Sequence, residues 1–278
     1  MNLGFICVGT VEDVGESRWI ELAGAANARD LGGLPTKDGQ VTLPDRLIRS
    51  DNLQGLTPAD VRALVDDHHV RAIADLRTDV EVSLEGPGPM TREPLVELHH
   101  LSLFPESGKN TDVAAAEDDG PVLLPWQTRE IPEDERKRGV AAIYLRYLDD
   151  RADSVIAALR LIAGTDGATL VHCAAGKDRT GVVIALALAE VGVERAAIFA
   201  DYALSADRIE AIFARLSASS TYADDLKDQA IDRHRPREST MEDLFAAMDE
   251  VHGGVPAWLR SHGWTDVDAA ALRRHLLG

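Results

Sequence analysis

The stretch from Thr169 to Gly181, TLVHCAAGKDRTG, constrains this chain more than any other part of its sequence. Apolar and β-branched residues lead into a His-Cys pair, which is followed by small residues and a charged cluster. From residue 182 to residue 191 the chain then becomes rich in Ala, Val and Leu. Two apolar runs on either side of a short Gly-containing segment predict a buried strand, a tight loop and a buried helix.

This loop has the features of an anion-binding site with a nucleophile in it. Backbone N–H groups of a loop that leads into a helix point inward, and the helix dipole adds positive potential there. Gly176 permits backbone angles and a close approach that a side chain would block. Arg179 offers a planar fork for two phosphate oxygens, and Lys177 adds charge. These cations favour Cys173 as a thiolate, which is the form that attacks phosphorus.

Spacing excludes two other interpretations of the stretch. A nucleotide P-loop would need Gly where Val171 stands, and Ser or Thr where Asp178 stands. A metal site would need a second pair of ligands beside His172 and Cys173. The five residues between Cys173 and Arg179 instead give the Cys-x5-Arg spacing of cysteine-dependent phosphatases. The alternative that stays open is a buried strand-end cysteine followed by a chance loop.

Composition narrows the classes of partner and of compartment. The 278 residues are 45% hydrophobic and 27% charged, which is ordinary for a globular protein with a substantial core. The net charge of -18 argues against nucleic acid or an anionic membrane as a partner, so an anionic substrate would need a locally positive pocket. Cys7 and Cys173 are the only cysteines, which excludes a disulfide framework and favours a reducing compartment.

The sequence contains neither a transmembrane segment nor a standard secretory signal. No apolar run of about 18 residues is present, so we expect no stable membrane insertion. Residues 1–8 lack the basic region and long apolar core of a standard secretory signal. We therefore expect a cytoplasmic protein, with secretion by a route that uses no standard signal left open.

The remaining chain alternates strands and helices before it ends in helices. Strands are predicted at residues 46–49, 70–76 and 96–103. Thr57 and Pro58 mark the start of a helix. Further helices are predicted at 139–163 with a break near 149–150, and at 195–204, 206–216, 241–251 and 266–277. Residues 106–125 are polar and acidic, which predicts a surface loop. This order predicts an α/β protein with a central, mostly parallel sheet flanked by helices.

Several separate motifs match one family. They are NARDLGG at residues 27–33, RSD at 49–51, DLR at 75–77 with Glu81, the loop at 172–181, and DYALS at 201–205. Together they resemble the bacterial cysteine-dependent tyrosine phosphatases related to mycobacterial protein tyrosine phosphatase B. The resemblance implies one phosphatase domain over residues 1–278, with a helical lid at about 205–237. It implies no metal and no cofactor.

The resemblance also implies the substrates. The family acts on phosphotyrosine and to some extent on phosphoserine and phosphothreonine, with inorganic phosphate as product and inhibitor. The Lys177–Thr180 variant resembles loops that also accept phosphoinositides, so a phosphoinositide phosphatase is the first alternative. An inactive phosphate-binding module is the second, although a binder would need no nucleophile. The basic residues 233–237 are either a solvated loop or a lid edge that steers an anionic substrate.

The general acid is open between two aspartates. The usual Trp-Pro-Asp signal is absent, yet the leaving oxygen needs a proton from a nearby carboxylic acid. Asp75 lies at the end of a predicted strand, where α/β active sites gather, and is the preferred candidate. Asp178 lies inside the loop and is the other candidate. The structural alternatives are an Asp75 that pairs with Arg77 and an Asp178 that orients Lys177 or Arg179.

The predicted site is therefore as follows. The catalytic residues are Cys173, Arg179 and Asp75 or Asp178. The phosphate-binding residues are Ala174, Ala175, Gly176, Lys177, Asp178, Arg179 and Thr180. The supporting residues are His172, Arg29, Asp30 and Arg77. The resemblance further implies a hydrogen bond from Thr180 to the sulfur of Cys173. We expect Arg29 and Asp30 to brace the site through backbone and side-chain bonds, and the alternative is a turn with a surface ion pair.

Overall fold

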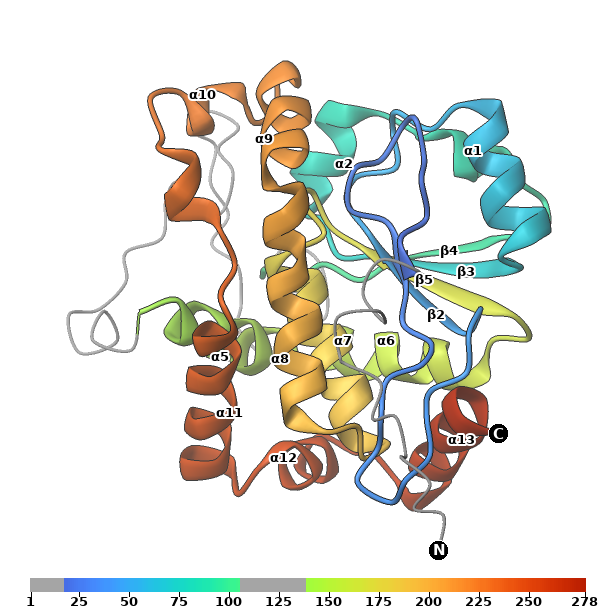
Figure 1. Cartoon of the computed structure of the whole chain (residues 1–278), viewed down its shortest axis with the longest axis vertical. Coiled ribbons are helices and arrows are strands. Elements are labelled where there is room, and N and C mark those ends of the chain that lie inside the picture. Colours follow the sequence, from blue (N-terminus) through green and yellow to red (C-terminus); the bar gives the residue numbers. More distant parts are fainter. Residues whose placement is uncertain (1–17, 106–138) are drawn as a thin grey trace, which may run out of the picture.

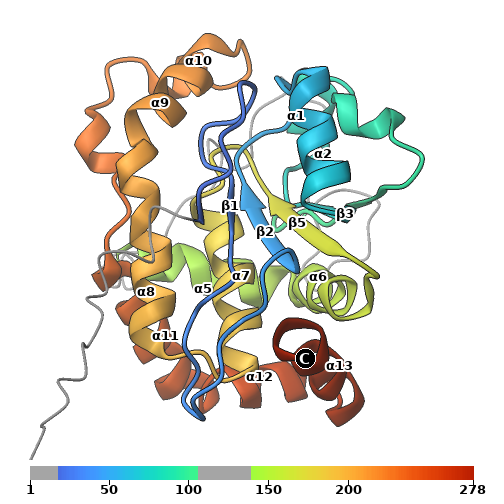
Figure 2. The same ribbon diagram turned by 45° about the vertical axis from the view of Figure 1, so that its right-hand side comes forward.

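A single sheet organises the part of the chain that the structure, a computed structural model, describes: residues 18–105 and 139–278. Within these ranges five strands pair in the order β1-β2-β5-β3-β4 (Figures 1 and 2). The strands are β1 Arg29–Asp30, β2 Leu47–Ser50, β3 Val70–Asp75, β4 Glu97–His100 and β5 Ala168–His172. Only β1 runs antiparallel to its neighbour, so the expectation of a mostly parallel sheet is confirmed.

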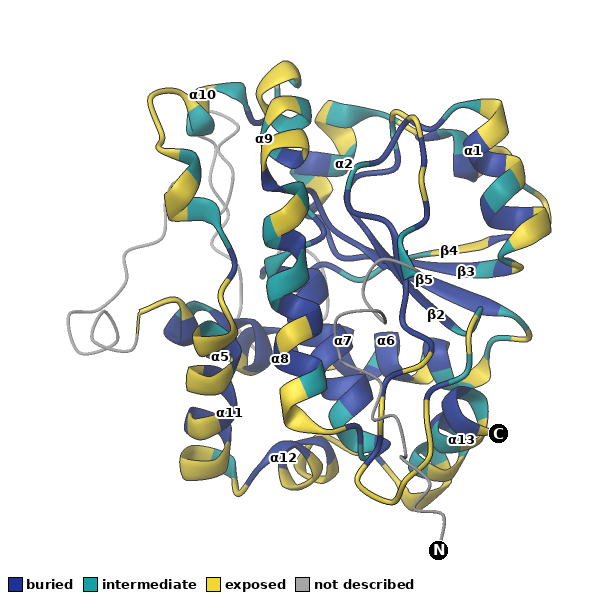
Figure 3. Ribbon diagram, viewed as in Figure 1, coloured by how far each residue is buried: buried dark blue, intermediate teal, exposed yellow. Residues whose placement is uncertain are grey.

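The strand that leads into the Cys173 loop lies in the middle of the sheet. β5 pairs in parallel with β2 on one side and with β3 on the other, and all of its residues are buried (Figure 3). In this register His172 lies beside both Ser50 and Asp75. The carboxyl ends of the three strands therefore meet at one edge, which is where ligand sites form in sheets of this type.

Helices cover both faces of the sheet. Val171, Ala74 and Leu47 belong to one buried cluster, and Leu170, Ile73 and Ile48 belong to another, because successive residues of a strand point to opposite faces. On the first face α6 Ala152–Gly164 and α7 Asp178–Glu190 contact the strands directly. The same buried cluster also includes residues of α5 Val140–Asp150, α8 Arg195–Leu204, α11 Glu238–His252, α12 Val255–Ser261 and α13 Asp266–Leu277. The second face packs against α1 Pro58–Arg62 and the π-helix Ala63–Asp67 (Figures 1 and 2).

Most helices lie where the sequence predicts them, with informative exceptions. The long helical stretch breaks at Arg151, whose side chain donates to the Phe104 carbonyl oxygen at 3.0 Å. Sequence reasoning missed α12 and also α2 Asp79–Glu85, which begins with a reciprocal cap between Thr78 and Glu81. The predicted loop at 106–125 and the residue Cys7 lie outside the described residues. No helix in the described ranges is long and apolar enough to cross a membrane.

The segment predicted as a lid, residues 205–237, is helical in several short pieces. They are the 3₁₀ turn Ser205–Arg208, α9 Ile209–Ala218, α10 Ala223–Leu226 and the 3₁₀ turn Ile231–His234. Arg215 of α9 anchors the segment, because its Nε lies 3.1 Å from Oδ2 of buried Asp51. Leu216, Tyr222 and His234 of this segment line the cavity that contains Cys173.

Candidate active site

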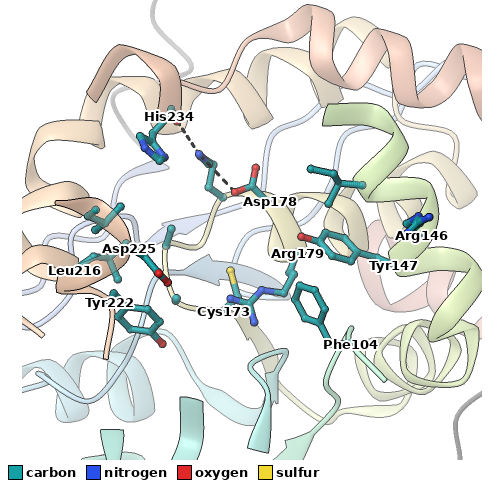
Figure 4. Close-up of a pocket in the computed structure, with 15 residues that line it drawn as sticks. Phe104, Arg146, Tyr147, Cys173, Asp178, Arg179, Leu216, Tyr222, Asp225 and His234 are labelled. Atoms are coloured by element: carbon teal, nitrogen blue, oxygen red, sulfur yellow. Dashed lines mark hydrogen bonds and ion pairs between the residues drawn. The ribbon is translucent and has the colours of Figure 1, made fainter. Parts of the chain in front are cut away.

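Cys173 opens into a cavity of about 470 Å³ at the carboxyl edge of the sheet. Asp178 and Arg179 line the same cavity, and the rings of Phe104 and Tyr147 form part of its wall (Figure 4). Cys173 follows β5, and α7 begins at Asp178, so the predicted strand, loop and helix are confirmed. The loop thus lies at the N-terminus of a buried helix of 13 residues.

Buried donors hold the loop from behind. The Asn27 side-chain amide donates to the carbonyl oxygens of Ala175 and Gly176, at 3.0 and 3.2 Å. Arg29 fixes this amide, because its Nη1 donates to Asn27 Oδ1 at 2.7 Å. Sequence reasoning included Asn27 in a matching motif without giving it a role. Its contacts make it a support of the phosphate loop.

Two further donors from the β2 region complete this support. Arg49 Nη2 donates to the carbonyl oxygen of Gly176 at 2.7 Å, and the Asn52 backbone N–H donates to that of Ala174 at 3.0 Å. In a trans peptide the N–H points away from the C=O. Carbonyls that bond to the scaffold therefore leave their partner N–H groups directed toward the cavity, which creates an anion-binding concavity.

Gly176 is required by this geometry. Its φ is +64°, in the left-handed region that favours glycine. A Cβ at this position would lie 2.3 Å from the carbonyl oxygen of Ser50. The loop therefore packs directly on the backbone of β2, as the expectation of a close approach at Gly176 required.

A buried ion cluster stands behind these donors. Asp201 on α8 accepts from Arg29 Nε at 3.1 Å and from Arg49 Nη1 at 2.7 Å. Burial alone would raise the pKa of Asp201, but these two guanidinium groups hold it well below its ordinary value. The bracing role predicted for Arg29 thus has a geometric basis through Asn27 and Asp201.

Asp30 bonds to a different part of the chain. Its Oδ1 accepts from the Gly32 N–H at 2.6 Å and its Oδ2 from the Asp45 N–H at 2.8 Å. Neighbouring residues on a strand point to opposite sides, so Asp30 faces this turn while Arg29 faces the loop. The bonds of Asp30 therefore support this turn, and its bracing role at the site stays a prediction.

Arg179 is held by Glu81, the first buried carboxylate of α2. Nη1 lies 2.6 Å from Oε2 and Nη2 lies 2.9 Å from Oε1. Burial would lower the pKa of Arg179, but Glu81 more than offsets this and raises it. Tyr222 of the lid segment donates to Glu81 Oε1 at 3.1 Å. Sequence reasoning gave Glu81 no role, although its cap with Thr78 was a readable signal of a fixed position.

Asp75 belongs to a different cavity from Cys173. It lines a neighbouring cavity with Arg77 and His172, and it is absent from the lining of the Cys173 cavity. Arg77 Nε and Nη2 donate to its carboxylate, with the shortest distance 2.6 Å. Burial would raise the pKa of Asp75, but His172 and Arg77 hold it well below its ordinary value. In this structure Asp75 thus lies apart from the cavity of the nucleophile and pairs with Arg77, which favours Asp178 over Asp75 as the candidate acid.

Asp178 has the position that a general acid needs. It lines the Cys173 cavity, with 35% of its side chain exposed. Its Oδ2 lies 3.5 Å from Lys177 Nζ, and Oδ1 accepts from the hydroxyl of Tyr144. Lys177 Nζ also donates to the carbonyl oxygen of His234 at 2.7 Å, which ties the loop to the lid segment (Figure 4).

His172, which precedes the nucleophile, and Thr180, which follows the arginine, are both buried. The His172 ring is buried, with Nδ1 3.2 Å from the Cys173 carbonyl oxygen, and burial lowers its pKa. The Thr180 hydroxyl is buried and has no hydrogen-bond partner within the described ranges. The predicted bond from Thr180 to the sulfur of Cys173 is therefore not made in this structure.

A thiol in an amide cradle, with a paired arginine and a carboxyl group in the same cavity, defines a cysteine-dependent phosphatase on an α/β fold. The chain belongs to the tyrosine phosphatase family, whose sequence profile matches residues 20–278. It is 31% identical to "Triple specificity protein phosphatase PtpB" of Mycobacterium tuberculosis, over 93% of this chain and 99% of that protein. It is 34% identical to "Tyrosine-protein phosphatase" of Nostoc commune, over 42% of each chain.

These findings establish the enzyme class. The chain is a protein tyrosine phosphatase, a hydrolase of phosphoric monoesters that acts on phosphorylated substrates. The family predicted from the separate motifs in the sequence is confirmed.

Proposed function

We propose that Cys173 is the nucleophile and Asp178 the general acid of this phosphatase. The Cys173 thiolate attacks phosphorus in line with the ester bond, and the S–P bond forms as the P–O bond breaks. Asp178 gives its proton to the leaving oxygen. Water then attacks the cysteinyl-phosphate while Asp178 takes a proton from it. This second step releases inorganic phosphate and restores the thiolate.

The arginine and the loop amides hold the transferring group. Arg179 and the N–H groups of residues 174–179 would bind the non-bridging oxygens and stabilise their charge in the transition state. Lys177 adds a further positive charge at the cavity wall. The observation that carries the proposal is that Cys173, Asp178 and Arg179 line one cavity, with Glu81 fixing the arginine.

Phosphotyrosine is the substrate that this cavity supports best. Phe104, Tyr147 and Tyr222 offer aromatic walls for a phenyl ring above the loop. The relative from M. tuberculosis is named a triple-specificity phosphatase. We therefore propose that phosphoserine and phosphothreonine are also hydrolysed, at lower rates. Phosphoinositides are the alternative substrates, for which the charge of Lys177 is the supporting feature.

The experiment is a side-by-side comparison of rates. Wild type and Cys173→Ser are assayed on p-nitrophenyl phosphate, phosphotyrosine and phosphoserine peptides, and monophosphorylated inositol lipids. We expect the fastest turnover on phosphotyrosine peptides and none with Cys173→Ser. Turnover of lipids with inert peptides would favour the phosphoinositide alternative. Retained activity in Cys173→Ser would remove Cys173 from its role, and phosphate binding without any turnover would indicate a binding module.

We further propose that residues 1–278 form one phosphatase domain whose lid is the segment 205–237. One connected buried cluster runs from Leu31 to Leu277, which supports a single unit. The cytoplasm is the proposed compartment, because Cys173 is a free thiol that a reducing environment would preserve. Limited proteolysis tests the proposal of a single domain with a lid. The protease should cut within residues 205–237 before it degrades the core, and inorganic phosphate should slow that cut.

A further inference from the structure

A chain of polar groups leads from the buried core to Asp178. The Tyr144 hydroxyl on α5 donates to Asp178 Oδ1, and the Tyr202 hydroxyl on α8 lies 2.8 Å from that of Tyr144. The two buried rings meet edge to face, with centroids 6.4 Å apart. Gly181 makes the approach of α8 feasible, because a Cβ there would lie 2.8 Å from the Tyr202 ring. Three side chains from three helices thus form one connected polar network.

The direction of these hydrogen bonds follows from the chemistry of the groups. An ionised carboxylate can only accept, so Tyr144 must donate to Asp178. Tyr144 has a single hydroxyl proton, so its oxygen accepts from Tyr202. Burial, followed by the charge of Asp178, raises the pKa of Tyr144 well above its ordinary value. Tyr144 therefore remains a protonated donor throughout the pH range in which a phosphatase works.

This arrangement makes the two oxygens of Asp178 different. Oδ1 is occupied by Tyr144, whereas Oδ2 lies on the side of Lys177, at 3.5 Å from Nζ. Because Oδ1 is engaged by the Tyr144 hydroxyl, Oδ2 is the oxygen that is left to exchange a proton with the substrate. The hydrogen bond at Oδ1 also fixes the plane of the carboxyl group, so that Oδ2 keeps one orientation.

We propose that Tyr144, supported by Tyr202, is a positioning residue for the general acid. It orients Asp178 and stabilises the negative charge that Asp178 acquires when its Oδ2 proton moves to the leaving oxygen. The P–O bond breaks and the S–P bond forms in that step, and the Tyr144 hydroxyl keeps its own proton. The inference rests on the proposed role of Asp178 as the acid.

The test is the pH dependence of kcat/KM in Tyr144→Phe, measured with a series of phosphate esters. Phe keeps the ring that stacks on Tyr147 and removes only the hydroxyl. Loss of one hydrogen bond to the carboxylate disfavours its charged form, so the alkaline limb of the profile should move to higher pH. The weaker acid should slow hydrolysis of alkyl phosphates by roughly tenfold, and of p-nitrophenyl phosphate by less.

Tyr202→Phe is a second variant, for which we expect a smaller effect. It leaves the bond between Tyr144 and Asp178 in place and removes the donor behind it, so its alkaline limb should move in the same direction by a smaller amount. The proposal is overturned if Tyr144→Phe melts cooperatively, and is therefore folded, but its pH profile has the same alkaline limb as the wild type. If Tyr144→Phe does not fold, a wild-type limb in Tyr202→Phe overturns it instead.

Asp178→Asn separates this inference from the function on which it rests. If Asp178→Asn slows poor leaving groups most but the tyrosine variants behave as wild type, only the role of Tyr144 fails. If Asp178→Asn shows no dependence on the leaving group, the acid assignment fails and the role of Tyr144 falls with it. Turnover of phosphotyrosine by the wild type is a separate readout of the enzyme class.

Discussion

Glu81 holds Arg179 through both oxygens of its carboxylate, at N–O distances of 2.6 and 2.9 Å. The pair is buried, and the Tyr222 hydroxyl of the lid segment bonds to the same carboxylate. The orientation of the arginine therefore depends on a residue that never needs to touch the phosphate. The lid segment and the arginine also share one acceptor.

Glu81→Gln should lower kcat/KM for aryl phosphates by roughly 10- to 100-fold, because loss of a charge-assisted pair frees the guanidinium plane. Inorganic phosphate should inhibit the variant more weakly. Steady-state kinetics with phosphate as inhibitor measures both effects. The matched control is Glu85→Gln, one turn further along α2, where the carboxylate accepts from Asn52 and Ser219 instead. Equal losses in the two variants would contradict a specific role for Glu81.

Asn27→Ala should weaken inhibition by inorganic phosphate about tenfold, because two loop carbonyls would lose their buried donor. Asn27→Asp should weaken inhibition by phosphate further, because a carboxylate would face the same carbonyl oxygens without a proton to donate. Competition with p-nitrophenyl phosphate gives the inhibition constants. Asp30→Asn, three residues further along the chain, serves as the control. Wild-type inhibition constants in both Asn27 variants would show that the loop holds its shape without this donor.

Asp178→Asn should slow alkyl phosphates by about 100-fold or more and p-nitrophenyl phosphate much less, because a good leaving group needs little protonation. Asp75→Asn should show a uniform effect across leaving groups, together with a lower melting temperature, because it breaks a buried ion pair with Arg77. A linear free-energy plot of log kcat/KM against leaving-group pKa separates the two. A steeper slope for Asp75→Asn alone would reverse the assignment made here.

Asp201→Asn should reduce the free energy of unfolding by about 3 kcal/mol at neutral pH, because it leaves buried guanidinium groups without their charge partner. The pKa of Asp201 is depressed in the folded state, so its contribution is present above the unfolded pKa and is lost as the pH falls. The difference between wild type and variant should therefore narrow below about pH 4. Urea unfolding at several pH values measures the free energy of unfolding of both proteins. A difference between them that does not change with pH would contradict this role of Asp201.

The strand, loop and helix around Cys173 could be predicted from the sequence because the features that indicate them lie close together in the chain. Strand, glycine, arginine and helix follow one another between residues 169 and 191, so the periodicity and the spacing could be read directly. The choice between Asp75 and Asp178 was different. It depends on Arg77, which folds back on Asp75, and on Tyr144, which reaches Asp178 from 34 residues away. Which carboxyl group faces the cavity is a property of the packed structure.

The partner of Arg179 could not be predicted from the sequence either, because this contact also depends on how the chain packs. Glu81 lies 98 residues away in the sequence, and only the parallel pairing of β3 with β5 brings the two together. The cap between Thr78 and Glu81 could have revealed a helix there, but not what its carboxylate holds. The helix α12 was missed because it is short and because its N-cap residue, Gly254, has no side chain to cap it.

The donors behind the phosphate loop come from β2 and from the segments next to β1 and β2, namely Arg49, Asn27 and Asn52. The loop is therefore not a portable module. Residues 172–181 transplanted onto another strand and helix would carry the nucleophile and the arginine, but their carbonyls would be free to turn inward and repel an anion. An engineer who wants this chemistry elsewhere must move the β2 region with it, including the Ser50 carbonyl on which Gly176 rests.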